Sequence, residues 1–338
     1  MKKIIILLSL TSFFIGLLPE CSLAINRDKR AQAGMKFLQV SLDARASALS
    51  SAITSMELNS SALMYNPAAM SRMEPFGHVS LGQMQWIADI NYFYGTAAFK
   101  PMGGQWGVVG LSAMAIDYGD LQGTILANNE QGFLDTRKFS PTAMTFGVGY
   151  AKALTNKFSI GGQVKYVQQN LNGGVENFSN GEVQQTRELA ADVMAFDFGI
   201  LYRTGFKSLN FGMNIRNFSQ EIEYIEESFQ LPLTFKMGIS MDVMDLTAYN
   251  SKRHSLITSV DASHPRDFEE QVSMGLEYVF MQMFALRMGY TAPTDEEGMS
   301  FGAGFRPSLD NLGLNVDYAY TPFGILEDVH RFTFQFSF

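Results

Sequence analysis

Arg331-Phe-Thr-Phe-Gln-Phe-Ser-Phe338, the final stretch of the sequence, decides the fold. Phenylalanine occupies every second position, and Thr, Gln and Ser stand between the rings. Successive side chains of a β-strand point to opposite faces, so the stretch predicts a strand with one apolar and one polar face. Such a strand suits a transmembrane barrel, where one face meets lipid and the other a polar interior. We therefore interpret Phe334, Phe336 and Phe338 as the C-terminal signal that the barrel-assembly machinery recognises.

The start of the chain predicts export from the cytoplasm. A short positive segment precedes an apolar run over residues 4–18, and small residues follow at 22–24, the order typical of a signal peptide. The run is too short for a retained membrane helix, which needs about 20 residues. Cys21 offers a lipoprotein interpretation, but the glutamate directly before it fits lipoprotein cleavage badly. We expect removal of residues 1–24, which leaves no cysteine for a disulfide or a thiolate site.

The composition narrows the class of protein further. Hydrophobic residues make up 46% of the chain and charged residues only 17%, which is apolar for a soluble protein. No apolar stretch of about 18 residues follows the signal, so the apolar residues are interleaved with polar ones. The formal net charge of -8 argues against a nucleic-acid partner, which requires a basic surface.

Alternating segments separated by turn residues predict a barrel domain over residues 77–338. Their number is even, as single-chain outer-membrane barrels require, so the predicted fold is an all-β, antiparallel transmembrane barrel. The predicted strands lie near 77–85, 90–99, 104–118, 139–153, 156–171, 187–204, 207–217, 231–244, 252–263, 269–280, 283–292, 298–307, 310–321 and 328–338.

Charged residues keep to one face of these segments. An Arg or Lys on the lipid face near the midplane costs about 2–4 kcal/mol, so the shared face must be the lumen. Lys152, Asp192 and His330 break the pattern, but each lies near a strand end, where the cost falls to about 0–1 kcal/mol. The charges either line a polar pathway or form ion pairs that brace the interior and hold a plug, and we favour bracing. The predicted lumen-facing charges are Lys165, Asp197, Arg203, Arg216, Lys236, Asp242, Asp261, Glu277, Arg287 and Asp317.

Strand and connection lengths separate this prediction from a soluble β-sandwich, whose strands also alternate. Sandwich strands usually have about 5 or 6 residues, and these segments are about twice as long. The long connections 119–138, 172–186 and 218–230 all fall at one end of the barrel, and the connections at the other end are mostly short. Outer-membrane barrels have short periplasmic turns and long outer loops, so the long connections are expected outside the cell.

Residues 25–76 differ from the barrel and predict a hatch folded into the lumen. The segment is rich in Ala, and its moderate apolar content argues against the alternative of a disordered periplasmic tail. Asn66-Pro67-Ala68 interrupts a short helical stretch. Proline fixes φ and removes a donor, and Asn66 can bond neighbouring backbone, so we interpret this motif as architectural. Arg45 is a natural partner for one of the lumen carboxylates.

Several stretches resemble the PorV/PorQ family of outer-membrane barrels, which are related to the FadL long-chain fatty-acid transporters. They are Phe37-Leu-Gln-Val-Ser-Leu-Asp-Ala-Arg-Ala46, Asn59-Ser-Ser-Ala-Leu-Met-Tyr-Asn-Pro-Ala-Ala-Met70 and Val316-Asp-Tyr-Ala-Tyr-Thr-Pro-Phe-Gly324. The chain departs from the family at Leu49-Ser-Ser-Ala-Ile53 and Glu57-Leu-Asn59, where a glycine-rich stretch and an acidic pair are common. The resemblance implies a fourteen-stranded barrel with a hatch and a part in type IX secretion. PorV-like barrels receive cargo that carries a C-terminal sorting domain and pass it to the attachment machinery.

Two functions remain open at this point. In the first, the long outer connections dock secretion-system subunits or cargo proteins, with apolar anchors among acidic side chains. In the second, small hydrophobic compounds pass through or beside the hatch, as in FadL. The candidate anchors are Phe133, Leu134, Tyr224, Ile225 and Phe229, and the acidic residues are Glu221, Glu223, Glu226 and Glu227.

Enzyme, metal and cofactor functions have little support in the sequence. The four histidines are scattered over separate segments without metal-ligand spacing, and no Gly-rich phosphate loop stands between a strand and a helix. Trp86 and Trp106 suit an aromatic girdle at the membrane interfaces. The expected partners are therefore outer-membrane lipid, the barrel-assembly machinery and secretion proteins.

Overall fold

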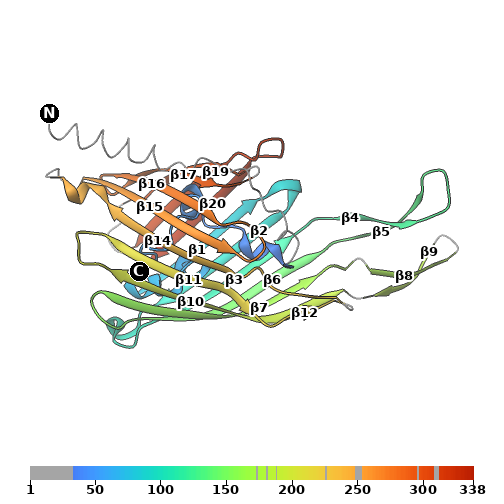
Figure 1. Ribbon diagram of the computed structural model, residues 1–338, viewed down its shortest axis with the longest axis horizontal. Coiled ribbons are helices and arrows are strands. Elements are labelled where there is room, and N and C mark those ends of the chain that lie inside the picture. Colours follow the sequence, from blue (N-terminus) through green and yellow to red (C-terminus); the bar gives the residue numbers. More distant parts are fainter. Residues whose placement is uncertain are drawn as a thin grey trace.

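The computed structural model describes residues 33–172, 174–179, 182–187, 189–224, 227–247, 253–294, 297–307 and 312–338. Fourteen antiparallel strands close into a barrel, which confirms the predicted fold class (Figure 1). The predicted signal peptide and the first residues of the predicted hatch, 25–32, lie outside the described residues. The barrel strands are β1 (Gly77–Gln85), β2 (Asn91–Phe99), β3 (Val108–Asp117), β6 (Thr142–Ala153), β7 (Phe158–Asn170), β10 (Ala190–Arg203), β11 (Asn210–Ser219), β14 (Thr234–Asp242), β15 (His254–Pro265), β16 (Gln271–Phe280), β17 (Phe284–Ala292), β18 (Met299–Phe305), β19 (Gly313–Thr321) and β20 (Val329–Ser337).

The two ends of the barrel sequence meet to close the sheet. β1 pairs with β20, with His78 opposite Ser337 and Gln85 opposite His330. Beyond this ladder, Gly77 and Phe338 exchange two backbone hydrogen bonds of 2.9 and 3.0 Å. The final aromatic strand is therefore the seam of the barrel, and its rings Phe334 and Phe338 point outward and are exposed.

The strands alternate between exposed apolar and buried polar side chains, as predicted. In β10, Phe198 is 55% exposed on the outer surface, whereas the neighbouring Asp197 is 1% exposed and faces the lumen. Lys152, Asp192 and His330 lie on the outer face of their strands, at positions that are not buried, and each lies near a strand end. The outer surface is therefore apolar along the middle of the wall.

Three two-stranded sheets stand apart from the barrel wall. They are the pairs β4 (Leu121–Leu126) with β5 (Phe133–Phe139), β8 (Gly174–Ser179) with β9 (Glu182–Arg187), and β12 (Ile222–Glu223) with β13 (Ser228–Phe229). Figure 1 shows the first two extending far beyond the barrel. The regions 119–138, 172–186 and 218–230, expected only as long connections, thus carry strands of their own. We call this end of the barrel the hairpin end and the opposite end the short-turn end.

The hatch, of which the structure describes residues 33–76, lies within the barrel as a series of short helices (Figure 1). Helix α2 packs against β17 to β20, and η4 packs against β6, β7 and β10. No helix among the described residues is long and apolar enough to span a membrane. The hatch helices are η2 (Lys36–Gln39), α2 (Ala44–Ala48), η3 (Ser60–Met64) and η4 (Pro67–Arg72).

The two tryptophans occupy different environments. Trp106 is 68% exposed near the short-turn end, as a residue of an aromatic girdle would be. Trp86 instead packs edge-on against Phe323, with ring centroids 4.9 Å apart, and the Arg331 guanidinium lies 5.7 Å from its ring centre. The expectation of a girdle position for Trp86 is wrong, because its ring joins the aromatic and cationic side chains that surround the hatch.

We predict that a charge placed on the outer wall destabilises the barrel most near the middle of the membrane and least near its surfaces. Phe198→Arg, in the middle of β10, should lower the free energy of unfolding in lipid vesicles by about 2–4 kcal/mol. Tyr202→Arg, near the end of the same strand and on the same face, should lower it by about 0–1 kcal/mol. Equilibrium denaturant titration of both variants measures the difference. Equal losses would contradict the assignment of this surface to lipid.

Candidate functional site

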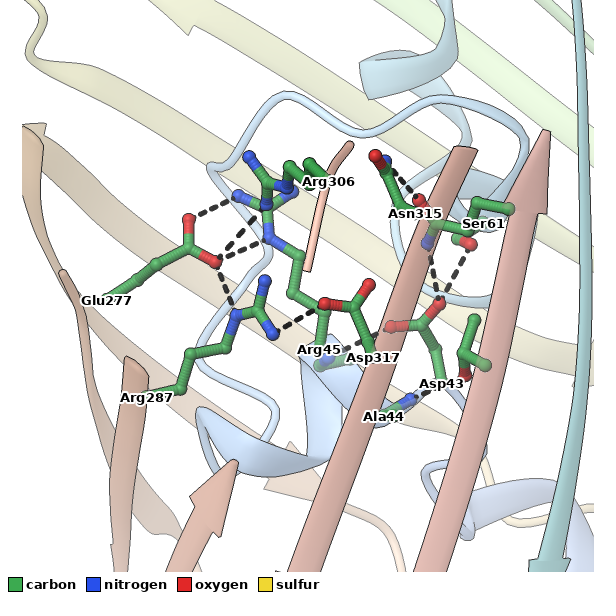
Figure 2. Close-up of polar contacts among 12 residues, drawn as sticks. Asp43, Ala44, Arg45, Ser61, Glu277, Arg287, Arg306, Asn315 and Asp317 are labelled. Atoms are coloured by element: carbon green, nitrogen blue, oxygen red, sulfur yellow. Dashed lines mark hydrogen bonds and ion pairs between the residues drawn. The ribbon is translucent and has the colours of Figure 1, made fainter. Parts of the chain in front are cut away.

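The most strongly charged contact between hatch and wall is an ion-pair group that we call the Glu277 cluster (Figure 2). Arg45 of α2 donates from Nε and Nη2 to the two Glu277 oxygens, at 2.9 and 2.8 Å. Arg287 of β17 donates to Glu277 Oε2 at 2.5 Å and to Asp317 Oδ1 at 2.7 Å. Arg306 approaches Glu277 Oε2 at 3.8 Å. The cluster thus joins the hatch to β16, β17 and β19.

Burial makes these ion pairs mutually dependent. Glu277 and Arg287 are 1% and 4% exposed, and each charge removed from water costs several kcal/mol unless a partner compensates it. Burial lowers the pKa of the Arg45 guanidinium, but the carboxylates of Glu277, Asp317 and Asp43 together raise it by more, so the net pKa lies above the ordinary value. Arg45 therefore remains charged, and its guanidinium holds the hatch to the wall with two charge-assisted hydrogen bonds.

Asp43 is a second buried anchor that the sequence analysis did not single out. Its Oδ1 accepts from the Ala46 backbone at 3.0 Å and caps α2, and its Oδ2 accepts from Ser61 at 2.9 Å and from Tyr94 at 3.1 Å. One carboxylate thus joins α2, η3 and β2. The local signal was an Asp directly before an Ala-rich helical run, a common N-cap arrangement. The partners Ser61 and Tyr94 are distant in sequence and gave no signal.

The Asn66-Pro67-Ala68 motif has a structural role. Pro67 is the first residue of η4, and Asn66 Oδ1 accepts from the Ala68 backbone at 3.2 Å. Asn66 Nδ2 donates to the carbonyls of Thr54 at 2.7 Å and Ile200 at 3.0 Å. Since Asn66 is fully buried, these bonds satisfy an amide that would otherwise be costly. The motif fixes the start of η4 against β10.

Other predicted lumen charges also contact the hatch. Arg216 donates to the Leu38 carbonyl at 3.3 Å, and its guanidinium lies 5.9 Å from the centre of the Tyr65 ring. Asp261 accepts from the Thr54 backbone at 2.9 Å. These contacts extend the attachment of the hatch to β11 and β15.

Arg203 pairs with Glu57 of the hatch at the short-turn end, at 2.5 Å. Both side chains are more than a third exposed, so solvent screens this pair and it adds little stability.

Six predicted lumen charges make no direct bond to the hatch among the described residues. Arg287 and Asp317 bind only wall residues, within the Glu277 cluster; the other four are Lys165, Asp197, Asp242 and Lys236. Lys165 forms an ion pair with Asp197 at 2.8 Å, within the wall. Asp242 accepts from the backbone of Met244 at 2.9 Å and caps the turn at the short-turn end. Lys236 has neither a hydrogen bond nor an ion pair within the described part of the chain, although its side chain lines an internal cavity.

Ser60 and His78 form a Ser-His pair of the kind that a hydrolase would use, but the pair is buried between the hatch and the wall, where a substrate has no access. Ser60 Oγ lies 2.8 Å from His78 Nδ1, and Thr96 donates to the same Ser60 oxygen at 2.9 Å. Ser60 and His78 are at most 1% exposed, and they sit between the hatch and β1. We interpret the pair as a polar contact that holds η3. Among the described residues, no group of His, Cys, Asp and Glu is arranged to hold a metal.

Glycines in the wall allow the hatch backbone to approach closely. A Cβ built on Gly161 of β7 would lie 2.5 Å from the backbone nitrogen of Ala68 and from the backbone carbon of Pro67. Gly212 of β11 faces the carbonyl of Thr54 in the same way. Since the neighbours are backbone atoms, a larger residue cannot be accommodated by a rotamer change.

The hatch separates two internal cavities. The hairpin-end cavity, of about 320 Å³, is lined by Ser47 and Ser50 of the hatch. The short-turn-end cavity, of about 540 Å³, is lined by Arg45 and Glu57. Because α2 contributes Arg45 to one cavity and Ser47 to the other, this helix is part of the partition between them.

A family model described as type IX secretion system membrane protein PorP/SprF matches residues 115–336, more than half of the chain. The chain therefore belongs to this family. The sequence motifs indicated the PorV/PorQ family, and the matching family model is that of PorP/SprF. The expected association with type IX secretion and the expected FadL-like barrel fold are confirmed. The protein is an outer-membrane β-barrel of a secretion family rather than of an enzyme family.

Solved structures similar to this chain include channels for aromatic hydrocarbons. The Pseudomonas putida toluene transporter TodX is 10% identical, with a TM-score of 0.56, over 86% of this chain and 95% of that chain. The Ralstonia pickettii toluene transporter TbuX is 12% identical, with a TM-score of 0.55, over 88% of this chain and 98% of that chain. The CymD monoaromatic hydrocarbon channel is 11% identical, with a TM-score of 0.54, over the same shares. At these identities the likeness shows the fold alone, and no curated protein matches significantly.

We predict that Arg45→Ala loosens the hatch. Loss of the two bonds to Glu277 should lower the free energy of hatch opening by about 1–3 kcal/mol, because a buried carboxylate loses a charged partner. Hydrogen exchange and limited proteolysis of residues 33–76 measure the opening. Arg72→Ala is the matched control, since Arg72 donates a single bond to the Thr155 carbonyl at the rim. Unchanged protease resistance of the hatch in Arg45→Ala would rule the prediction out.

We also predict that adjacent glycines of β7 differ sharply in tolerance. Gly161→Ala should displace η4 and speed its hydrogen exchange roughly tenfold or more, since overpacking costs about 1–3 kcal/mol. Gly162→Ala should have little effect, because its Cβ would meet no atom closer than 3.4 Å. Both substitutions remove the same backbone freedom, so a shared effect would point to strand propensity and not to the hatch contact.

Proposed function

We propose that this barrel is a cargo-docking or shuttle component of type IX secretion, and that it binds partners through the hairpin end. The observation that carries the proposal is the projection of the β4–β5 and β8–β9 hairpins far beyond the barrel wall (Figure 1). With short turns on the periplasmic side, as outer-membrane barrels have, these hairpins extend from the cell surface. Family membership supplies the secretion context.

The β4–β5 hairpin offers apolar side chains to a partner. Leu126 is 96% exposed, and Phe133 and Leu134 are each 43% exposed near the turn. Apolar side chains gathered at a projecting tip are typical of surfaces that bind another protein. Among the described residues, no third strand is hydrogen-bonded to this two-stranded sheet, so an extended partner segment has backbone groups to pair with.

The other anchors expected from the sequence have a different role. Tyr224 and Phe229 stack on each other, with ring centroids 5.3 Å apart, and Phe229 packs over Gly34. The Gly34 backbone donates to the Gln230 carbonyl at 3.1 Å. These rings therefore support the β12–β13 hairpin and the first described residues of the hatch, and Ile225 lies outside the described residues. The proposal consequently rests on β4–β5 and not on β12–β13.

The hatch inside the lumen supports the docking of protein partners and argues against the passage of small hydrophobic compounds. The hatch is attached by buried charged and polar contacts at Arg45, Asp43 and Asn66, and the cavities on its two sides are lined by charged side chains. A pathway for small hydrophobic compounds would need an apolar lining. The fold shared with toluene transporters is the one observation that favours this second function, and the experiment below includes it as an outcome.

We predict that Leu126→Asp combined with Leu134→Asp removes partner binding without affecting barrel assembly. Gentle affinity purification of the tagged protein from its own outer membrane, followed by mass spectrometry, measures co-purifying proteins and extracted small molecules. Partner recovery should fall roughly tenfold or more, since a lost apolar anchor costs about 2 kcal/mol. The control is Leu246→Asp, at a leucine that is 51% exposed in a short-turn-end connection.

The identity of the recovered molecules decides between the two functions. Enrichment of secretion-system subunits, or of proteins that share a C-terminal sorting domain, supports docking if the double variant loses them. A barrel that carries a stoichiometric hydrocarbon and no protein partner would replace docking with transport.

A further inference from the structure

The hairpin formed by β4 and β5 has one open edge, that of β4. Among the described residues β4 pairs with β5 alone, in an antiparallel ladder. The second projecting hairpin approaches from the other side, because β9 lies close to β5. Figure 1 shows β4 on the side of its hairpin that is turned away from β8 and β9. An extended segment that joins this sheet from outside therefore finds its backbone partners on β4.

The ladder determines which backbone groups of β4 point outward. Ala127, directly after the strand, donates its backbone N–H to the Gly132 carbonyl at 3.1 Å, so residue 127 bonds toward β5. In the same register Thr124 stands opposite Asp135. Hydrogen-bonded and non-hydrogen-bonded pairs alternate along an antiparallel ladder, so the backbone groups of Thr124 and Leu126 point away from β5. Each of these two residues offers an N–H and a C=O group at the open edge.

The part of this edge that can accept a strand lacks the usual protection. The register shifts between Gln122 and Thr124, so regular pairing is confined to the residues next to the tip. Natural edge strands are commonly protected by charged side chains or by proline. The strand β4, Leu-Gln-Gly-Thr-Ile-Leu, contains neither, whereas β5 carries Asp135, Arg137 and Lys138. Of the two strands, β4 is therefore the one that is open to a partner.

We propose that a secretion partner adds an extended segment to the β4 edge beside Thr124 and Leu126, as a third strand of the hairpin sheet. The inference rests on the docking function proposed above and specifies how the hairpin holds its partner. In recognition by strand addition, main-chain hydrogen bonds supply affinity and the alternate side chains supply specificity. The exposed apolar side chains at the tip then contact the same partner.

The side chains of β4 indicate the chemistry of the added segment. Side chains alternate between the two faces of a strand, so Thr124 and Leu126 share one face of the sheet and Ile125 lies on the other. All three are uncharged, and neighbouring strands gain most from apolar and β-branched pairs. We therefore expect an uncharged partner segment with apolar or β-branched residues beside Leu126 and Ile125.

A second copy of this chain fits the open edge poorly. Two copies in one membrane have the same orientation, so a twofold axis between them lies along the membrane normal. Their β4 strands would then run parallel, with identical backbone groups at the same height. An N–H group would face an N–H group and a C=O group a C=O group, which is incompatible with ladder bonds. The occupant that we propose is therefore a different protein.

The test is gentle affinity purification of the tagged full chain from its own outer membrane, with two proline variants. Thr124→Pro removes a backbone donor at the open edge, a position where an edge strand tolerates proline. Recovery of the secretion partner should fall roughly fivefold or more, as for loss of one backbone hydrogen bond with added steric hindrance. Asp135→Pro is the matched control, because its N–H points to the opposite edge of the sheet, and this variant should retain the partner.

The outcomes separate this inference from the docking function. Loss of the partner in Thr124→Pro, with retention in Asp135→Pro, supports strand addition to β4. If Thr124→Pro retains a partner that the double variant Leu126→Asp and Leu134→Asp loses, side chains alone hold that partner, so strand addition is wrong and docking stands. Equal loss in both proline variants also overturns strand addition. A partner that the double variant retains would contradict docking at this hairpin itself.

Hydrogen exchange on the unmodified chain keeps the test independent of variant folding. In the complex purified from the native outer membrane, the amides of Thr124 and Leu126 should exchange at least tenfold more slowly than in the same chain refolded without partners. The amide of Asp135, on the opposite edge, should exchange at the same rate in both. Equal rates at Thr124 in the two states, or dimers of the refolded chain that Thr124→Pro separates, would overturn the proposal.

Discussion

The pairing of charges inside a closed barrel is the constraint on which the rest of this structure depends. The outer wall must be apolar, so the charges of the strands face a lumen that offers them little water. An unpaired charge there costs several kcal/mol, and the wall alone does not pair all of them. Glu277 illustrates the solution, because it binds Arg287 of the wall and Arg45 of the hatch at the same time. The hatch therefore completes the electrostatics of the barrel interior as well as filling its space.

Shape and charge act together in this attachment. The hatch has short helices and extended segments whose backbone groups need partners. The wall side chains of Asp261 and Arg216 bind hatch backbone groups, and Asn66 of the hatch binds the Ile200 carbonyl of the wall. Such bonds need the hatch backbone near the wall, and Gly161 allows that approach for the start of η4. A hatch fixed by backbone bonds to several strands is positioned by the whole barrel, so no single contact controls it alone.

The strands of the wall could be predicted well from the sequence. A lipid boundary requires apolar and polar side chains to alternate strictly along each strand, and this alternation allows few strand registers. All fourteen barrel strands were expected, with ends displaced by a few residues. The projecting hairpins were missed for a related reason. Leu121 and Leu126 of β4 are exposed to solvent, so no buried face imposes an alternating pattern on that strand.

Contacts between distant segments limited prediction of the site. The sequence indicated that Arg45 would meet a lumen carboxylate, but only the register of β16 with β17 places Glu277 beside Arg287 and within its reach. Asp43 was hidden for the same reason, since Tyr94 lies on β2. Trp86 was misplaced because an aromatic residue near a strand end has two apolar environments available, lipid and the packed hatch. Its neighbours Phe323 and Arg331 come from the other end of the chain.

The β4–β5 hairpin and the β12–β13 hairpin differ in how they are connected to the hatch, and this difference affects how such a barrel can act in secretion. The hairpin tips stand apart from the wall, whereas β12–β13 is joined to the hatch through Gln230 and Phe229. A partner bound at the tip of β4–β5 acts on a sheet that is free of the lumen charges, so docking there does not require the hatch to move. A partner that engaged β12–β13 would pull directly on the segment that enters the lumen. Under the docking function that we propose, recognition therefore lies with the projecting hairpins, and the hatch stays closed while a partner is held.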